Sequence, residues 1–330
     1  MRNSISFLIF LLLVSWMTGH AQDSSRHKHL PIIDVHVHAM KVNPAFANDM
    51  CPWFLSNMPG GDPNQPSPVF INTDCAEPLK AAKSDKEFQD ALVSTMKRLN
   101  MTIVASGDAA VIREWQKAIP GRVIPSLSLS SSKDMSAKAF QDSISSGFYK
   151  VMGEVAPQYQ GMSPSDTSLD AYFAIAEKLN IPVGIHMGTG GNGTINIDNP
   201  KYRASLGNPF LLEDLLARHP KLKIWVMHAG YPMIDEMIAL MGAHAYVYVD
   251  LAGMIWSYPL EEIHSYLKRL VQAGFGKRIL YGTDLLIWPK LLETSIGVIE
   301  NANYLSFEQK RDILFNNAVR FFRLDESKFR

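Results

Sequence analysis

Cysteine is scarce in this sequence, and neither sign of charge is in surplus. Among 330 residues there are two cysteines, and 32 basic residues balance 32 acidic ones. The scarcity of cysteine excludes a disulfide-rich scaffold. Because no stripe of lysine and arginine stands out, nucleic acid is not an expected partner. With 47% hydrophobic residues the chain can bury one large core, and α/β barrels often reach this length as a single unit.

Long hydrophobic runs are also scarce, and the one near the N-terminus is short. Residues 5–17 form an apolar run of 13 residues after Arg2, and the segment 18–21 that follows contains the small residues Thr18, Gly19 and Ala21. A membrane-spanning helix needs about 20 apolar residues, so this pattern favours a secretory signal over an uncleaved anchor. We predict a signal peptide at residues 1–22 and an exported, periplasmic or extracellular protein, with no stable membrane insertion once the signal is removed.

Export would place the mature chain in an oxidising compartment. We predict a polar leader at residues 23–30 and one domain at residues 31–330. Cys51 and Cys75 lie in one segment, so a disulfide between them is plausible, and two buried free thiols are the alternative. The sequence does not decide whether the protein forms a homodimer.

From residue 31 onward, short apolar runs alternate with longer amphipathic stretches. The runs are rich in β-branched residues and bounded by glycine, proline or asparagine, as is typical of strands buried on both faces. Eight strands are predicted: Ile32–Val37, Met101–Ser106, Val123–Leu127, Phe148–Val155, Val183–His186, Lys223–His228, Tyr246–Asp250 and Arg278–Gly282. The predicted helices are Asp85–Leu99, Asp108–Ala118, Lys133–Ser146, Ser168–Leu179, Asn208–Arg218, Pro232–Ala243, Leu260–Ala273 and a closing helical region at Phe307–Phe322. Ser168 and Ser306 stand where helix caps are expected. The repetition of strand and helix predicts parallel strands closed into a (β/α)8 TIM barrel.

Two stretches interrupt this alternation. Residues 40–84 follow the first strand and are rich in proline, glycine, asparagine and aspartate, whereas residues 188–207 follow the fifth strand and are rich in glycine and asparagine. In a barrel the loops after the strands form the functional face. We therefore expect both long loops to cover or line the pocket, with plain surface insertions as the alternative.

Polar residues stand at the ends of several predicted strands. His36 and His38 share one face of the first strand, because alternate residues point the same way. The fifth strand ends at His186, the sixth ends at His228, and Asp284 follows the eighth. Burying imidazoles in a barrel interior without partners would be costly. The pattern predicts a metal site at the carboxyl ends of the strands, with His36, His38, His186 and Asp284 as ligands.

The order of these residues resembles that of the amidohydrolase superfamily. A His-x-His motif, two single histidines and an aspartate follow strands one, five, six and eight, and Gly282-Thr283-Asp284 and residues 313–322 add to the resemblance. The similarity is greatest to the branch that contains aminocarboxymuconate semialdehyde decarboxylase and related hydrolases. The resemblance implies a TIM barrel, a divalent cation, and a strand-eight aspartate, here Asp284, that serves as both ligand and proton acceptor.

Glu154 adds a candidate ligand on the fourth strand. Superfamily members with two metal ions often carry a carboxylated lysine there, but here Lys150 lies early in the strand and Glu154 lies at its end. Glu154 could bind a second ion, contact substrate or form a structural ion pair. One ion, Zn2+ or another divalent metal, is the expected number, and two stay open. With one ion, His228 is expected just outside the ligands, where it would stabilise a developing oxyanion.

Side chains on the long loops and near the strand ends are candidates for substrate binding. Arg203 could anchor a carboxylate, or could equally be a solvated basic residue. Trp53 and Tyr159 could line the pocket. Asp34 is expected either to hold a ligand histidine or to point with the histidines of its own strand. The other histidines of the domain are expected on the surface: His219, His244 and His264.

Three imidazoles and a carboxylate suit a cation such as Zn2+ that keeps a position open for water. We therefore predict a metal-dependent hydrolase that cleaves an amide, ester or lactone bond of a small molecule through a metal-activated water. The alternative is a metal-dependent non-oxidative decarboxylase of an aromatic or unsaturated acid, because the related branch contains such enzymes. A metal-binding module without catalysis is a third hypothesis, and the presence of Asp284 argues against it.

Overall fold

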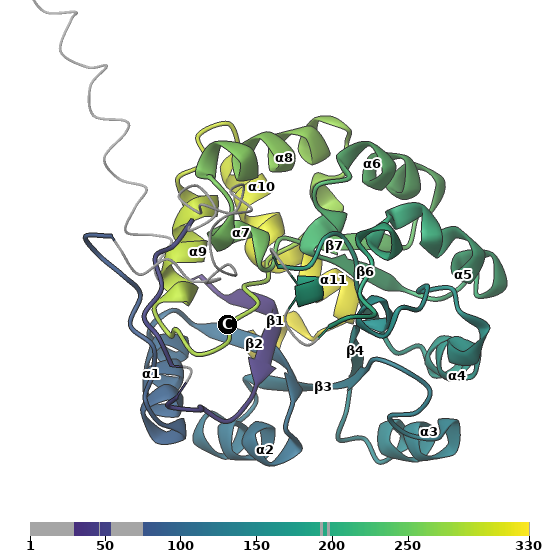
Figure 1. Cartoon of the computed structure of the whole chain (residues 1–330). Helices are drawn as coiled ribbons and strands as arrows, with labels where there is room; N and C mark the ends of the chain where they lie inside the picture. Colours follow the sequence, from purple (N-terminus) through teal and green to yellow (C-terminus); the bar gives the residue numbers. More distant parts are fainter. Residues whose placement is uncertain (1–29, 46, 54–74, 192–193, 197–198, 330) are drawn as a thin grey trace, which may run out of the picture.

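The computed structural model of the chain describes residues 30–45, 47–53, 75–191, 194–196 and 199–329. Eight parallel strands lie side by side in sequence order, from β1 to β8, and helices surround them (Figure 1). The predicted TIM barrel is therefore confirmed. The predicted signal peptide lies outside the described residues, so export stays a prediction. No helix within the described ranges is long and apolar enough to cross a membrane.

The strands are β1 (Ile32–Ala39), β2 (Met101–Gly107), β3 (Val123–Leu129), β4 (Val151–Val155), β5 (Val183–His186), β6 (Ile224–Met227), β7 (Val247–Asp250) and β8 (Ile279–Leu280). The α-helices are α1 (Asp85–Arg98), α2 (Ala109–Ala118), α3 (Ala137–Ser145), α4 (Asp170–Leu179), α5 (Glu213–Arg218), α6 (Ile234–Ala243), α7 (Met254–Ser257), α8 (Leu260–Gln272), α9 (Leu291–Glu300), α10 (Phe307–Arg311) and α11 (Asn317–Phe322). A π-helical turn, Asp312–Asn316, joins α10 to α11.

The two faces of β6 enter different apolar cores. On β6, Ile224 and Val226 pack in the cluster between the strands and the outer helices, whereas Trp225 packs in the barrel interior. The closing segment contributes Phe321 to the interior cluster, and its ring stands edge-on to the indole of Trp225 with 5.6 Å between ring centres. One end of the barrel is thereby filled with apolar side chains, which leaves the carboxyl ends of the strands for polar ones.

β1 also pairs with the segment around β8, and this pairing closes the barrel. The N–H of Val35 donates to the carbonyl of Tyr281 at 2.9 Å, and the N–H of Asp284 donates to the carbonyl of His36 at 2.8 Å. The first and last strands are therefore joined by backbone hydrogen bonds, and residues from the two ends of the domain become neighbours.

β1 carries a bulge that decides which of its residues face the barrel interior. In its register against β2, three steps along β1, from Asp34 to Val37, match two steps along β2. Ile33 and Val35 lie in the interior cluster. Past the bulge the alternation is reversed, so His36 faces the interior although it directly follows Val35.

Of the two predicted helix caps, one is confirmed and one was wrong. Ser306 caps α10, where it forms a capping box with Gln309. Ser168 is not a cap, because the side chain of Asp166 caps the turn that leads into α4. The helix α9 was not predicted. Six of its residues are buried, so it lacks the broad polar face that marks a surface helix in a sequence.

The expectation that three histidines lie on the surface was wrong for His219. This residue follows α5 and is buried, and its Nε2 atom lies 3.4 Å from a carboxylate oxygen of Asp170 on α4. His244 and His264 are half-buried. His219 therefore joins two neighbouring outer helices and has no place in the rim cluster.

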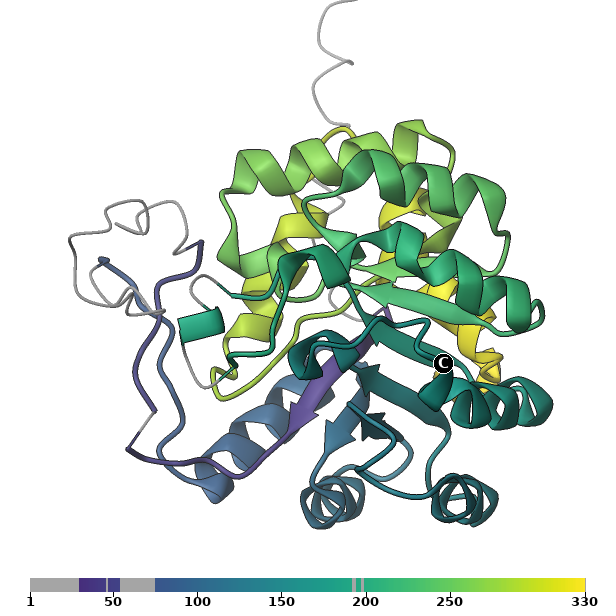
Figure 2. The same cartoon turned by 45° about the vertical axis from the view of Figure 1, so that its right-hand side comes forward.

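The described arms of the long loop after β1 lie side by side next to the barrel (Figure 2). Met50 forms an antiparallel bridge with Leu79. Cys51 and Cys75 form a disulfide, with their Cα atoms 6.1 Å apart. Of the two alternatives for the cysteines, the disulfide is therefore confirmed.

Gly184 on β5 faces the barrel interior at the point where the indole of Trp225 crosses it. A Cβ atom at position 184 would lie 2.3 Å from Cζ2 of Trp225. The variant Gly184→Ala should therefore lower the free energy of unfolding by about 1–3 kcal/mol, because the enclosed indole cannot move away. Denaturant unfolding followed by circular dichroism measures this change.

A matched control is Gly242→Ala on α6, where an added Cβ would meet no atom within 4 Å. This variant should raise the free energy of unfolding by up to about 1 kcal/mol, because alanine is the better helix former. A Gly184→Ala protein as stable as the wild type would contradict the packing described for Trp225.

Candidate metal centre

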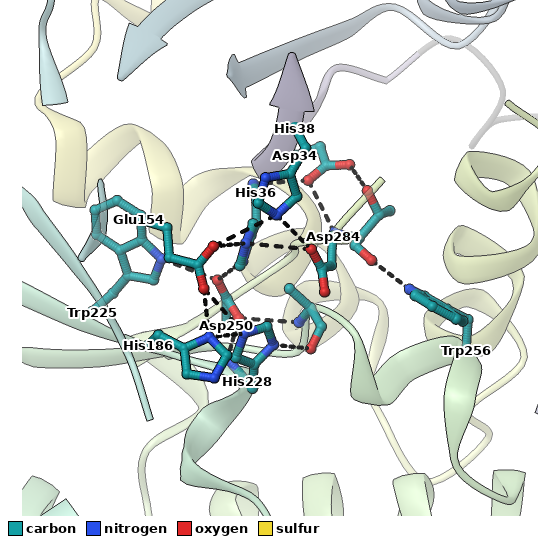
Figure 3. A network of polar contacts seen from close by, with 12 residues as sticks. Asp34, His36, His38, Glu154, His186, Trp225, His228, Asp250, Trp256 and Asp284 are labelled. Carbon is teal, nitrogen blue, oxygen red and sulfur yellow. Dashed lines mark hydrogen bonds and ion pairs between the residues drawn. The ribbon is translucent and has the colours of Figure 1, made fainter. Parts of the chain in front are cut away.

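Six side chains from the ends of five strands converge above the apolar interior (Figure 3). They are His36, His38, Glu154, His186, His228 and Asp284. Their donor atoms form two compact groups, and within each group all donor atoms lie within 4.8 Å of one another. The expectation that these strand ends meet at one place is therefore confirmed, while the role of each side chain as a ligand stays a prediction.

His36 and His38 direct their Nε2 atoms at the carboxylates of Asp284 and Glu154. Nε2 of His38 lies 2.8 Å from Oδ1 of Asp284 and 3.6 Å from Oε2 of Glu154. Nε2 of His36 lies 3.6 Å from Oδ1 of Asp284 and 3.8 Å from Oε2 of Glu154. Ligands bonded at about 2.0–2.1 Å to a tetrahedral cation lie about 3.3 Å from one another. The four atoms are therefore spaced like donors around one cation.

The other oxygen of Glu154 faces a second pair of histidines. Oε1 contacts Nδ1 of His186 and lies 3.7 Å from Nε2 of His228, and these two nitrogens are 2.9 Å apart. The sequence grouped His186 with His36 and His38, whereas the structure places it with Glu154 and His228. Each pair of histidines thus faces one oxygen of Glu154, and this carboxylate lies between the two pairs.

Burial and the neighbouring histidines have opposing effects on the pKa of each of the two carboxylates, and the histidines prevail at both. Burial would raise the pKa of Glu154, but the histidines around it, His186 foremost, outweigh burial and hold that pKa well below its usual range. Burial likewise opposes ionisation of Asp284, yet His36 and its neighbours lower the pKa of Asp284 overall. Both carboxylates therefore stay ionised at neutral pH.

One imidazole nitrogen that faces both carboxylates is buried and has no hydrogen-bond partner among the described residues. It is Nε2 of His36. A buried polar atom without a partner is costly, and so is a pair of ionised carboxylates gathered at low solvent exposure. A divalent cation would accept the lone pair of the nitrogen and would balance the charge of the carboxylates. Imidazole and carboxylate donors together suit such an ion. The residues present therefore fit a divalent metal.

Asp34 holds the backbone near the cluster and not an imidazole ring. Its carboxylate accepts from the N–H of His36 at 3.0 Å, and from the N–H and the hydroxyl of Thr283 at 3.0 and 2.5 Å. Burial raises the pKa of Asp34 to about 7, although these hydrogen bonds lower it. Asp34 was expected either to hold a ligand histidine or to point with the histidines of its own strand. It does hold His36, but it does so through the main chain.

Asp250, the last residue of β7, was missed by the sequence analysis. It is completely buried beside the cluster (Figure 3). Its carboxylate lies 3.1 Å from Nδ1 of His36 and accepts from the indole N–H of Trp225 at 3.0 Å. One signal was available, because Asp250 ends a predicted strand in the same way as His186.

The three loop residues proposed to bind substrate fall in different places. The ring of Tyr159 stands edge-on to the imidazole of His186, with 5.0 Å between ring centres. Trp53 is half-buried on the loop after β1, and its backbone N–H donates to the carbonyl of Trp256. Arg203 is exposed, and its guanidinium donates to carbonyls of its own loop. Of the three, Tyr159 is the one that contacts the cluster, and substrate binding stays a prediction for all of them.

Three solved structures are similar to this chain at low sequence identity. An uncharacterised TIM-barrel protein of Bordetella bronchiseptica is 17% identical with a TM-score of 0.61, and the match covers 89% of this chain and 99% of that chain. The probable 2-pyrone-4,6-dicarboxylic acid hydrolase of Acinetobacter baumannii is 10% identical with a TM-score of 0.55, over 89% and 99%. A 5-carboxyvanillate decarboxylase of Novosphingobium aromaticivorans, complexed with manganese, is 15% identical with a TM-score of 0.52, over 70% and 79%. These likenesses show the fold alone.

The comparison by sequence family is more specific. Among curated proteins none matches this sequence. The amidohydrolase family model, however, matches residues 33–324, which include both donor groups and the barrel from the second residue of β1 to α11. The chain therefore belongs to the amidohydrolase family.

Proposed function

We propose that the protein is a metal-dependent hydrolase that cleaves an amide, ester or lactone bond of a small molecule. The observation that carries this proposal is the convergence of two pairs of histidines on the carboxylates of Glu154 and Asp284. A bound divalent cation would lower the pKa of a water molecule toward about 7 and polarise the carbonyl to be attacked. The residues of the chain must then hold the cation, accept a proton from the water and pass it to the leaving group.

Asp284 is the candidate for proton transfer. Its Oδ1 faces the Nε2 atoms of His36 and His38, whereas its Oδ2 makes no hydrogen bond to any residue that the structure describes. The side chain is 22% exposed, so this oxygen is accessible. Gly253 borders it, and a Cβ atom there would lie 3.1 Å from Oδ2. Asp284 can therefore accept a proton from water and return it to the leaving group.

We also propose that the centre holds two divalent ions, with Zn2+ as the first candidate and Glu154 between them. The position of His228 supports this number. Its Nδ1 lies 2.9 Å from the carbonyl of Ala252, which can only accept, so Nδ1 carries the hydrogen and Nε2 is left free toward Glu154. In a centre with one ion, His228 would instead be available to stabilise a developing oxyanion.

Non-oxidative decarboxylation of an aromatic or unsaturated acid is the second candidate, because a manganese-containing carboxyvanillate decarboxylase shares the fold. The same donors would serve both reactions. Decarboxylation requires a proton for the carbon atom that loses CO2. Burial raises the pKa of Asp284, but His36 and its neighbours outweigh burial and lower it, so Asp284 begins as a proton acceptor. In hydrolysis the accepted proton would pass to the leaving group, and in decarboxylation it would pass to the carbon atom, so the products formed distinguish the two reactions.

Removal of metal should abolish the activity, and its return should restore it. The purified protein would be assayed on panels of esters, lactones, amides and aromatic acids, before and after chelation and again with Zn2+ or Mn2+ added. New acid without CO2 would support hydrolysis. CO2 released from an acid would instead support decarboxylation and overturn the hydrolase proposal. Full activity in a protein shown by elemental analysis to contain no metal would contradict both candidates.

The variant Asp284→Asn should lower kcat by about 100- to 10,000-fold, because an amide cannot accept the proton. Its oxygen can still face the ions, so the metal content measured by elemental analysis should fall far less than kcat. Asp90→Asn is a matched control, since Asp90 is an exposed carboxylate on α1 paired with Lys86. A loss of metal in proportion to the loss of kcat would assign Asp284 to metal binding alone.

The variant Glu154→Gln should remove one of the two proposed ions, because a neutral amide cannot bridge two cations. Elemental analysis of protein reconstituted with Zn2+ would give the number of ions per chain. The control is Glu177→Gln, since Glu177 also lies near a histidine, His219, but outside the cluster. A wild-type protein that holds one ion at saturation, or a Glu154→Gln protein that keeps two, would refute the bridging role.

A further inference from the structure

The carboxylate of Asp250 is enclosed by nitrogen atoms on all sides. It is completely buried, and its Oδ1 accepts from the backbone N–H groups of His228 at 2.8 Å and Ala252 at 3.0 Å. Its Oδ2 accepts from the indole N–H of Trp225 at 3.0 Å and lies 3.1 Å from Nδ1 of His36. Each oxygen therefore has two partners, which is the full capacity of a carboxylate.

Three of these four partners can only donate. The two backbone N–H groups and the indole N–H have no lone pair to offer, so they fit an ionised carboxylate that accepts from every side. The fourth partner is Nδ1 of His36, which lies within hydrogen-bond distance of the same ionised oxygen. That nitrogen must then carry a hydrogen and donate it to Asp250.

We propose that Asp250 is a positioning residue that fixes His36 in the tautomer with its hydrogen on Nδ1. The Nε2 atom is then left with a free lone pair. That atom is buried without a hydrogen-bond partner among the described residues, and it faces Asp284 and Glu154 at 3.6 and 3.8 Å. The inference rests on the proposed metal centre, and in it Asp250 acts on a ligand without contacting the ion.

Asp250 is not itself suited to bind the cation, although it lies within ligand range of His36 and His228. An ion at its carboxylate would displace N–H groups that are already paired, including those of the main chain at His228 and Ala252. Those N–H groups would then be buried without partners, at a cost of about 1–3 kcal/mol each. A carboxylate that orients a ligand histidine is the arrangement that metal sites commonly use.

Trp225 holds this carboxylate in place, and Gly184 makes room for its indole. The indole of Trp225 is completely buried and crosses the barrel where Gly184 leaves room for it. Its Nε1 atom fixes Oδ2 of Asp250, the same oxygen that faces His36. The packing of the interior thus sets the orientation of Asp250, and Asp250 sets that of the imidazole.

The variant Asp250→Asn tests the proposal. If its amide oxygen keeps the two backbone N–H groups, its NH2 group must face Nδ1 of His36 and turn that atom into an acceptor. The hydrogen of the imidazole then moves to Nε2, the atom that should bind metal. The affinity of the metal-free protein for Zn2+, measured by competition with a chromogenic chelator, should fall about 10- to 100-fold. In 15N NMR of histidine-labelled, metal-free protein, recorded at a pH alkaline enough to keep His36 neutral, His36 should change from the Nδ1–H to the Nε2–H tautomer.

Asp34→Asn is the matched control. Asp34 is an equally buried carboxylate bonded to the backbone of His36, but it does not face the ring. An amide there can accept from both backbone N–H groups and donate to the hydroxyl of Thr283. The tautomer of His36 and the zinc affinity should therefore stay close to those of the wild type. Trp225→Phe removes one donor to Asp250 but keeps the acceptor for His36, so it should also keep the tautomer.

The two measurements together decide the proposal. An Nε2–H tautomer of His36 in the wild-type protein would overturn it, and so would a zinc affinity in Asp250→Asn equal to that of Asp34→Asn. Weaker zinc binding with an unchanged tautomer would also overturn it, because Asp250 would then act only on stability. If Asp250→Asn does not fold, the wild-type tautomer gives the answer. A wild-type protein that binds no zinc would instead remove the proposed metal centre, and the tautomer would still report on Asp250.

Discussion

The closure of the barrel between β1 and the segment after β8 is the constraint on which the site depends. Asp34 and Thr283 are 249 positions apart, yet the carboxylate of Asp34 accepts hydrogen bonds from both the N–H and the hydroxyl of Thr283. The N–H of Asp284 donates to the carbonyl of His36 at 2.8 Å. The hydrogen bonds that complete the barrel therefore also set Asp284 beside the histidines. A cation held from both sides of this junction would stabilise the closed barrel, because it binds the folded form alone.

The packing of the interior reaches the chemical site through one chain of contacts. The indole of Trp225 lies against Phe321 of the closing segment on one side and donates to Asp250 on the other. Asp250 in turn faces His36. A change that shifts the indole would thus alter the orientation of a metal ligand as well as the stability of the core, so the two properties are expected to be coupled in variants of this region.

The barrel and the residues at its polar end could be predicted because several strands are apolar until a histidine or aspartate follows, and this pattern is visible in the sequence alone. The register of one strand against the next is not visible in the sequence. The bulge in β1 reverses the alternation between Val35 and His36, which no local pattern indicated. The assignment of His186 to the group of Glu154 depends on how β4 and β5 stand in three dimensions. Arg203 likewise looked like a ligand for anions, but its guanidinium donates to carbonyls of its own loop.

The carboxylates near the site differ in the donors that reach them, and this difference separates structural from chemical roles. Asp34 and Asp250 are fully buried and are satisfied by N–H and O–H groups of the protein. Glu154 and Asp284 are 15% and 22% exposed, and their close contacts are imidazoles. A carboxylate whose lone pairs are all occupied has nothing left for a cation, whereas one that faces only imidazoles at an accessible edge does. The position of an aspartate at a strand end thus does not determine its function; the donors that the fold directs at it do.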